Sequence, residues 1–239
     1  MIKIDKVDIY GWEASIRGMR NPMNSWEKSD SWYSYVSDVH AIINGELVHQ
    51  NPAEHVFCIG VNDWDLMTHL RNAGTDHRKF MRMIIVYMDI TAPLYWWKEF
   101  DTYKVGTVAN SCSTMHKIAE KEFTFDDFSH EKLINSACME IQEQHIRISP
   151  IQALATTIEC LNSYRNLYLQ TNDKKYWWQM IQLLPSSYNQ KRTVMLSYEV
   201  LANMYKSRKN HKLDEWIEFC KTIETLPYQE LITGGKSNG

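Results

Sequence analysis

The spacing of hydrophobic residues changes along the chain, from strand-like near the N-terminus to helix-like in the second half. Residues 2–9 alternate loosely between apolar and polar positions and end at Gly11, which predicts a short strand. A second strand is predicted over residues 79–90, centred on the apolar run 83–88. Residues 47–59 fit either a short strand or an irregular segment.

The first half of the chain also carries helical patterns and one polar interruption. A helix is predicted over residues 12–19, followed by an ordered loop over residues 20–32, where Asn-Pro and small polar residues accumulate. Asn62 is a predicted N-cap for a helix that stops at Gly74. Pro93 fits the first turn of a further helix, since its missing N–H costs nothing there. The apolar side chains of that helix are Leu94, Trp96, Trp97 and Phe100.

The second half is predicted to be almost entirely helical. Ser149 and Pro150 combine a capping residue with proline at the first helical position, which marks a helix start. The predicted helical segments are 126–148, 150–168, 174–184, 191–208 and 212–226. No internal repeat and no linker rich in proline, glycine or serine divides the chain. We therefore predict one α+β domain over residues 1–232 and a flexible tail over residues 233–239.

Composition narrows the class of protein. The 239 residues are 44% hydrophobic with only 9 glycines and 6 prolines, which excludes disordered and collagen-like chains and disfavours a turn-rich all-β fold. The net charge of −3 provides no global basic field for nucleic acid. The longest wholly apolar run, 83–88, is far shorter than the roughly 20 residues that span a bilayer.

Several common signatures are absent from the sequence. The first residues form no apolar secretory signal, and the 5 cysteines are widely spaced without a CxxC pair, which together favour a cytoplasmic location. No histidine pair has HxxxH or HExxH spacing, so His49 and His55 are not expected to bind metal. Phosphate-loop and G-x-S-x-G motifs are missing as well.

Two segments concentrate groups that can do chemistry. Residues 76–79 and Arg82 gather cationic and titratable side chains where a helix is predicted to turn into a strand, and such a cluster suits an anionic cofactor. Alternatively it is a solvated start of the strand. The second segment, residues 96–115, joins an aromatic helix to a loop of small hydroxylated residues that includes Cys112. A ring system could stack there, or Trp96 and Trp97 simply belong to the core.

The order of these features resembles the flavin-dependent thymidylate synthase family (ThyX). That family has an HxSxxEH stretch entering a strand, then a helix running into the motif RHRxxSxNExSxRY, and later an RxxLP element. His77 falls on the leading histidine, residues 102–115 lie over the long motif, and Leu184-Pro185 match the Leu-Pro. Arg208 falls on the arginine that ends a later helix, so the resemblance covers roughly residues 60–225.

The long motif is degenerate in this chain. Thr102, Tyr103 and Lys104 replace its leading Arg-His-Arg. Thr107 and Cys112 replace its two serines, and Thr114 replaces the arginine of its final Arg-Tyr. Several charge-assisted contacts, each worth about 1.5–3 kcal/mol, are thereby removed unless other cations replace them.

The resemblance implies a fold, a reaction and a set of site residues. The fold would be α+β, with a small antiparallel sheet and a mainly helical C-terminal half. The reaction would be reductive C5 methylation of dUMP, or a related C5 modification, with FAD as cofactor, methylenetetrahydrofolate and NADPH as co-substrates, in a homotetramer. The implied catalytic residues are His77, Cys112 and Arg208; the cofactor-binding residues are Lys79, Lys104, Thr107 and Arg208; the substrate-binding residues are Glu99, Asn110, Cys112 and Thr114.

Two other functions remain open at this point. The replaced motif residues fit a scaffold that has lost catalysis and binds a nucleotide or a partner protein. The Trp- and Arg-containing stretch 12–32 fits single-stranded nucleic acid, although its acidic residues and the net charge oppose that function. Cys112 itself is either an inert thiol or a nucleophile activated by nearby Lys104.

Overall fold

The fold was analysed in a computed structural model of residues 1–239, which describes residues 1–35, 41–43, 46–48, 55–136, 139–141 and 146–235. The helices in this part of the chain are α1 (Trp12–Arg20), α2 (Val61–Asn72), α3 (Leu94–Phe100), α4 (Thr114–Lys117), α5 (Pro150–Thr171), α6 (Lys174–Leu183), α7 (Tyr198–Arg208), α8 (Asp214–Ile223) and α9 (Glu230–Thr233). The strands are β1 (Lys3–Tyr10), β2 (Trp32–Tyr35), β3 (Ala41–Ile43), β4 (Glu46–Val48), β5 (His55–Cys58), β6 (Ile85–Pro93), β7 (Thr107–Ser111), β8 (Met139–Ile141), β9 (Ile146–Ile148) and β10 (Asn189–Ser197).

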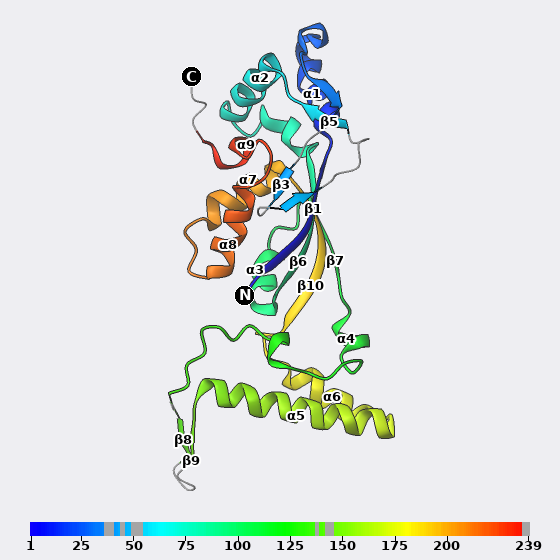
Figure 1. The fold of residues 1–239 in the computed structure, drawn as a ribbon, viewed down its shortest axis with the longest axis vertical. Coiled ribbons are helices and arrows are strands. Elements are labelled where there is room, and N and C mark those ends of the chain that lie inside the picture. The colour runs from blue at the N-terminus through cyan, green and yellow to red at the C-terminus, as the bar shows by residue number, and fades with distance from the viewer. Residues whose placement is uncertain (36–40, 44–45, 49–54, 137–138, 142–145, 236–239) are drawn as a thin grey trace. The chain divides into compact units, whose positions relative to one another are not determined.

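Strands from distant parts of the sequence form one four-stranded sheet in the order β1-β6-β10-β7 (Figure 1). The central strand β6 buries every second residue, Val86, Met88, Ile90 and Ala92, which is the period of a strand with one face in a core. β2 with β5, β3 with β4, and β8 with β9 form two-stranded antiparallel sheets. The α+β class and the helical C-terminal half predicted from the sequence are confirmed.

The described residues cluster into two compact units. One contains residues 1–8, 87–195 and 207–222, and we call it unit 1. The other, unit 2, contains residues 9–86, 196–206 and 223–239. The single domain over residues 1–232 stays a prediction, and most of the predicted tail, 236–239, lies outside the described residues.

Two predicted helices are wrong in whole or in part. In the described part of residues 126–148, a 3-10 turn at Phe125–Asp127 is followed by irregular chain and by the paired strands β8 and β9. Phe128 pairs with Tyr188 in an isolated β-bridge instead of continuing a helix. The segment predicted as helix 191–208 is strand β10 up to Ser197, and helical only from Tyr198. Burial at Val194 and Leu196 follows the strand period of two.

The second predicted strand begins later than expected. Residues Arg78–Arg82 form a 3-10 helix, and the strand starts at Ile85. Phe80 and Met81 are adjacent and both buried, which a strand with one buried face does not allow. Lys79 is therefore an exposed residue of a helical turn and not the start of a strand.

The loop predicted over residues 20–32 is ordered by a distant residue. Within unit 2, the buried Asp63 of α2 accepts hydrogen bonds from Arg20 Nε (2.7 Å), Ser29 Oγ (2.7 Å) and Ser31 Oγ (2.6 Å). In return, Asp30 caps α2, since its carboxylate accepts from the backbone amides of Asn62 and Asp63 at 2.9 and 3.1 Å. The predicted N-cap at Asn62 is thus wrong, because the cap comes from a residue far away in the sequence.

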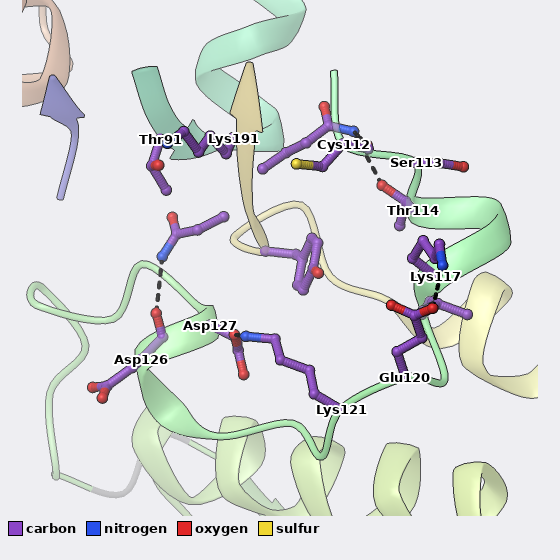
Figure 2. Close-up of a pocket in the computed structure, with 14 residues that line it drawn as sticks. Thr91, Cys112, Ser113, Thr114, Lys117, Glu120, Lys121, Asp126, Asp127 and Lys191 are labelled. Atoms are coloured by element: carbon purple, nitrogen blue, oxygen red, sulfur yellow. Dashed lines mark hydrogen bonds and ion pairs between the residues drawn. The ribbon is translucent and has the colours of Figure 1, made fainter. Parts of the chain in front are cut away.

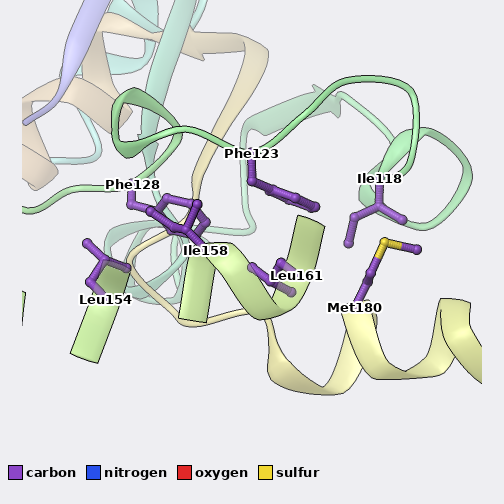
Figure 3. Packing of buried hydrophobic residues seen from close by; sticks show 7 residues of the cluster. All are labelled: Ile118, Phe123, Phe128, Leu154, Ile158, Leu161 and Met180. Carbon is purple, nitrogen blue, oxygen red and sulfur yellow. The ribbon is translucent and has the colours of Figure 1, made fainter. Parts of the chain in front are cut away.

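Two apolar clusters form the core of unit 1. Trp96, Trp97 and Phe100 of α3 are fully buried and pack against Trp216 and Phe219 of α8. Of the two interpretations of these tryptophans, core packing is the correct one. The second cluster lies where α5 packs along α6 (Figure 3), and its members are Ile118, Phe123, Phe128, Leu154, Ile158, Leu161 and Met180.

Among the described residues, no helix is both long enough and apolar enough to cross a membrane.

Candidate functional site

The segment that resembles the long family motif forms a turn, a strand and a short helix in unit 1. Gly106 has φ +76, a conformation that favours glycine, and it leads into β7, which pairs with β10. Ser113 then caps α4, since its hydroxyl accepts from the backbone amide of His116 at 3.2 Å. Val108, Ala109, Asn110 and Ser111 of β7 are exposed, so the motif segment is a surface with polar groups and not part of the core.

One side of this segment lines a small pocket, which we call the Lys104 pocket. It has a volume of about 420 Å³ and is lined by Phe100, Asp101, Tyr103, Lys104, Thr107 and Ala109. The Thr107 hydroxyl oxygen is buried there without a hydrogen-bond partner among the described residues. Lys104 is exposed and makes no ion pair with any of the residues that the structure describes. Because a hydroxyl and an ammonium can both donate hydrogen bonds, the residues of this pocket suit an anionic or carbonyl-bearing group.

The end of β7 lines a second pocket of about 420 Å³, which we call the Cys112 pocket (Figure 2). Cys112, Ser113 and Thr114 form one wall, and Lys121, Asp126 and Asp127 lie opposite in the view of Figure 2. The remaining lining residues are Thr91, Lys117, Ile118, Glu120, Tyr188, Asn189, Gln190 and Lys191. The pocket is within the size range of small-molecule sites in proteins, about 300–1,000 Å³.

The charges that line the Cys112 pocket are balanced. Lys121 pairs with Asp127, and this hydrogen bond raises the pKa of the Lys121 ammonium. Lys191 pairs with Asp89 at 3.0 Å, which likewise raises the pKa of Lys191. Among the described residues, Lys117 pairs only with the exposed Glu120, an interaction that contributes little in water. Lys117 is therefore the lysine of this pocket that can most easily turn towards an anionic ligand.

An aromatic wall completes the Cys112 pocket. The Tyr188 ring packs edge-on against Phe123 and Phe128 of the α5–α6 core, with ring centroids 6.3 and 5.7 Å apart. Burial raises the pKa of the Tyr188 phenol, and the negative charge of Asp127 raises it further, so the phenol stays protonated. Ile118 belongs both to the pocket lining and to this core.

The structure brings together some of the residues that the resemblance implies and adds pocket residues that the sequence did not indicate. Lys104 and Thr107 share one pocket, and Cys112 and Thr114 share the other. Tyr188, Asn189, Gln190 and Lys191 were missed because residues from 191 onward read as a helix. The apolar residues Val194 and Leu196, two positions apart between the polar Thr193 and Ser197, were the signal in the sequence for a strand that would carry these residues to the pocket.

Glu99 and Arg208 are brought together, but they bind each other. Arg208 donates to Glu99 Oε2 at 2.7 Å and to the Tyr103 hydroxyl at 2.9 Å, and its guanidinium lies 4.9 Å from the centroid of the Trp216 ring. His211 Nδ1 accepts from the Leu213 amide, so its proton is on Nε2, which faces Glu99 at 3.3 Å. Neither Glu99 nor Arg208 lines the Lys104 or the Cys112 pocket.

The remaining predicted site residues lie elsewhere. His77 and Lys79 belong to unit 2 and are exposed, whereas their neighbours Arg78 and Arg82 pair with Glu199. Asn110 is exposed on β7 and lines neither pocket of unit 1 described above. His49 and the side chain of His55 lie outside the described residues, within which no group of three or more histidine, cysteine, aspartate or glutamate side chains is placed to hold a metal ion.

Comparison with known proteins finds similar structures but no similar sequence. No family model and no curated protein sequence matches the chain. Among solved structures, flavin-dependent thymidylate synthase ThyX from Helicobacter pylori, complexed with FAD and dUMP, is similar with a TM-score of 0.62 at 15% identity, over 96% of this chain and 99% of that chain. A second structure of that enzyme with FAD and dUMP gives a TM-score of 0.63 at 14% identity, over 98% of both chains.

A nucleotide methylase shares the same fold. The UMP/dUMP methylase PolB from Streptomyces cacaoi, bound with 5-Br dUMP, is similar with a TM-score of 0.54 at 12% identity, over 94% of this chain and 89% of that chain. Identities this low establish a shared fold and leave the chemistry to be argued from the residues of the site.

Proposed function

Because the chain has a divergent ThyX-like fold, we propose that it is a flavin-dependent methylase acting on C5 of a pyrimidine nucleotide. The nucleotide would occupy the Cys112 pocket, and a flavin would contact Lys104 and Thr107. One observation carries the proposal: the segment that resembles the family motif, residues 102–115, contributes to the walls of both pockets. The structural relatives bound to FAD and dUMP, or to 5-Br dUMP, support the same ligand classes.

The residues of the Lys104 pocket fit part of a flavin nucleotide. The buried Thr107 hydroxyl oxygen has no hydrogen-bond partner among the described residues, and the Lys104 ammonium can pair with a phosphate or a ring carbonyl. When bound, a flavin supplies hydride transfer, while the protein binds and orients the reactants. Lysine here replaces a family arginine and cannot form the same two-pronged contact, so flavin affinity is expected to be lower than in the family.

The Cys112 pocket presents hydroxyl groups and the Lys117 ammonium, which can bind a nucleotide. Ser113 and Thr114 present hydroxyls, and Lys117 can leave its exposed partner Glu120 for a phosphate. We extend the proposal to methylenetetrahydrofolate and NADPH as co-substrates, to a homotetramer and to a cytoplasmic location. The roles that the resemblance implies for His77, Lys79, Glu99, Asn110 and Arg208 stay predictions, because none of these residues lines the Lys104 or the Cys112 pocket.

A second candidate function has its own observation in favour. Arg208, which falls on the family arginine that ends a later helix, is already bound by Glu99 and Tyr103. An arginine held in this way is less available to a pyrimidine, which favours a scaffold that binds a nucleotide without methylating it. The two functions differ in one measurement: mass spectrometry of dUMP incubated with the protein, FAD, NADPH and methylenetetrahydrofolate detects a C5-methylated product only for the enzyme.

Replacing Lys104 with methionine is expected to weaken FAD binding about tenfold, because one charge-assisted hydrogen bond is lost. Thr107→Val is expected to weaken it to a similar or smaller extent. FAD binding is measured by quenching of flavin fluorescence. The control is Lys98→Met, since Lys98 is an exposed lysine of α3 that does not line the pocket. If wild type, K104M and T107V bind FAD with equal affinity, the flavin does not bind in this pocket.

Alkylation of Cys112 by iodoacetamide is expected to slow severalfold when dUMP is bound, because the exposed thiol lines the proposed nucleotide pocket. Peptide mass spectrometry over time measures the rate, and Cys160 on α5, which does not line the pocket, provides the internal control. A rate at Cys112 that saturating dUMP leaves unchanged contradicts the assignment of the pocket. Full turnover by Cys112→Ala would exclude the thiol from the chemistry.

A further inference from the structure

One wall of the Cys112 pocket is held by a chain of side-chain hydrogen bonds that starts at β10. Gln190 donates through its amide nitrogen to the Cys112 carbonyl at 3.0 Å and to the Thr114 hydroxyl oxygen at 3.1 Å. Its amide oxygen accepts from Arg192 Nε at 3.0 Å. All three of these bonds lie within unit 1.

The orientation of the Gln190 amide is determined by its partners. A carbonyl oxygen can only accept, and an arginine can only donate, so the amide nitrogen must face Cys112 and the amide oxygen must face Arg192. Gln190 therefore uses both of its N–H groups on the wall formed by Cys112 and Thr114.

Arg192 is itself fixed, which makes the chain rigid. Its guanidinium is mostly buried, donates to Asp101 at 2.7 Å, and lies 4.3 Å from the centroid of the buried Trp97 ring. The Trp97 indole N–H donates to the Gln190 backbone carbonyl at 2.9 Å. Asp101 lines the Lys104 pocket, so the chain runs from the wall of one pocket to the wall of the other.

A consequence follows for the Thr114 hydroxyl. Because its oxygen already accepts from Gln190, its own proton is directed to another acceptor, and Thr114 lines the Cys112 pocket. We propose that Gln190, held by Arg192, is a positioning residue that sets the Thr114 hydroxyl as a hydrogen-bond donor to an acceptor oxygen of the nucleotide. This inference rests on the proposed function for the identity of the ligand.

The decisive variant is Gln190→Glu, which keeps the shape and the contact with Arg192 but replaces a donor by an acceptor. The Thr114 proton would then turn towards the new carboxylate, and dUMP binding is expected to weaken at least tenfold. The added negative charge also repels a phosphate, so the same substitution is made in a Thr114→Val background. If Gln190 orients the Thr114 hydroxyl, Q190E lowers dUMP affinity much less in the Thr114→Val background than in wild type. If repulsion alone is responsible, Q190E lowers the affinity equally in both backgrounds.

Further variants separate positioning from folding. Thr114→Ser keeps the hydroxyl and is expected to bind dUMP within about threefold of wild type, whereas Thr114→Val is expected to lose about tenfold. Gln179→Glu on α6 introduces the same chemical change outside both pockets and serves as the control. Isothermal titration with dUMP gives the affinities, and melting curves identify any variant that fails to fold.

A measurement without ligand keeps this inference separate from the proposed function. Gln190→Met releases the Cys112 carbonyl and the Thr114 hydroxyl, so iodoacetamide is expected to alkylate Cys112 severalfold faster than in wild type. Unchanged alkylation in Q190M, or full dUMP affinity in T114V, overturns the positioning role. Failure of wild type to bind dUMP overturns the proposed nucleotide site instead, and the alkylation rates still decide whether Gln190 holds the wall.

Discussion

Asp63→Asn is expected to lower the free energy of unfolding by about 3–5 kcal/mol, because it leaves the buried guanidinium of Arg20 without a countercharge. Arg20 is only 4% exposed and Asp63 is fully buried, so water cannot replace the lost partner. The ion pair is direct, with Arg20 Nε 2.7 Å from Asp63 Oδ1. The substitution should also release residues 29–31, because the hydroxyls of Ser29 and Ser31 and the backbone amides of Asp30 and Ser31 donate to the second oxygen of Asp63.

The same carboxylate predicts how stability depends on pH. Burial by itself raises the pKa of Asp63, but hydrogen bonds from Ser31, Ser29 and Arg20 outweigh burial and hold the pKa below its usual value. A lowered folded-state pKa contributes stability above the unfolded-state pKa, near 3.9, and this contribution is lost as the pH falls through the folded-state pKa. Wild type should therefore lose stability steeply at acidic pH, and D63N should show a shallower slope there.

Urea unfolding at several pH values measures both effects. Asp65→Asn is a matched control on the same helix, because Asp65 is exposed and is expected to change stability by less than about 0.5 kcal/mol. If D63N and D65N unfold at the same urea concentration, Asp63 does not order the loop. Parallel pH profiles for D63N and wild type would contradict the pKa argument alone.

Leu161→Ala is expected to destabilise unit 1 by about 2–5 kcal/mol, since it leaves a cavity in the core between α5 and α6. Leu161 is fully buried among Phe123, Phe128 and Met180 (Figure 3). The matched control is Leu169→Ala on the same helix, because the Leu169 side chain is 56% exposed and has little buried surface to lose.

This core also supports the Cys112 pocket, so the variant has a second expected effect. Ile118 belongs to both, and Tyr188 of the pocket packs on Phe123 and Phe128. A loosened core should weaken dUMP binding in L161A under conditions where the variant is still folded, while L169A binds like wild type. Thermal melts give the stability and titration gives the affinity. Equal losses in the two variants would show that α5 is not packed as described.

Local sequence patterns predicted the secondary structure correctly where a segment interacts mainly with residues close to it in the sequence. The first strand, the helix capped by Ser149 and the helix stop at Gly74 were all predicted correctly. Ser149 caps α5 through its own hydroxyl and Gln152, three residues away, and Gly74 has φ +115 immediately after the C-cap. Each of these features depends on atoms only a few residues apart, so the sequence near the feature contains the cause.

The errors occurred where the stabilising partner is distant in sequence. Asp30 caps α2 from about thirty positions away, and Phe128 is held extended by Tyr188, so neither effect is visible in a local window. The segment from residue 191 carries apolar residues at spacings that suit a helix as well as a strand. The segment forms a strand because it lies between β6 and β7 in the sheet, where a central strand gains hydrogen bonds on both edges.

By itself, the sequence determined the α+β class and the resemblance to the ThyX family, from which the segment 102–115 was predicted to carry the chemistry. Only the tertiary structure decided that Lys104 and Thr107 line one pocket, that Cys112 and Thr114 line another, and that Gln190 and Arg192 connect the two through hydrogen bonds. Only the structure revealed that Arg208 is bound by Glu99. The physical reason is the same in each case: residue types and spacing specify local backbone preferences, whereas side-chain partners are chosen by which strands and helices pack together.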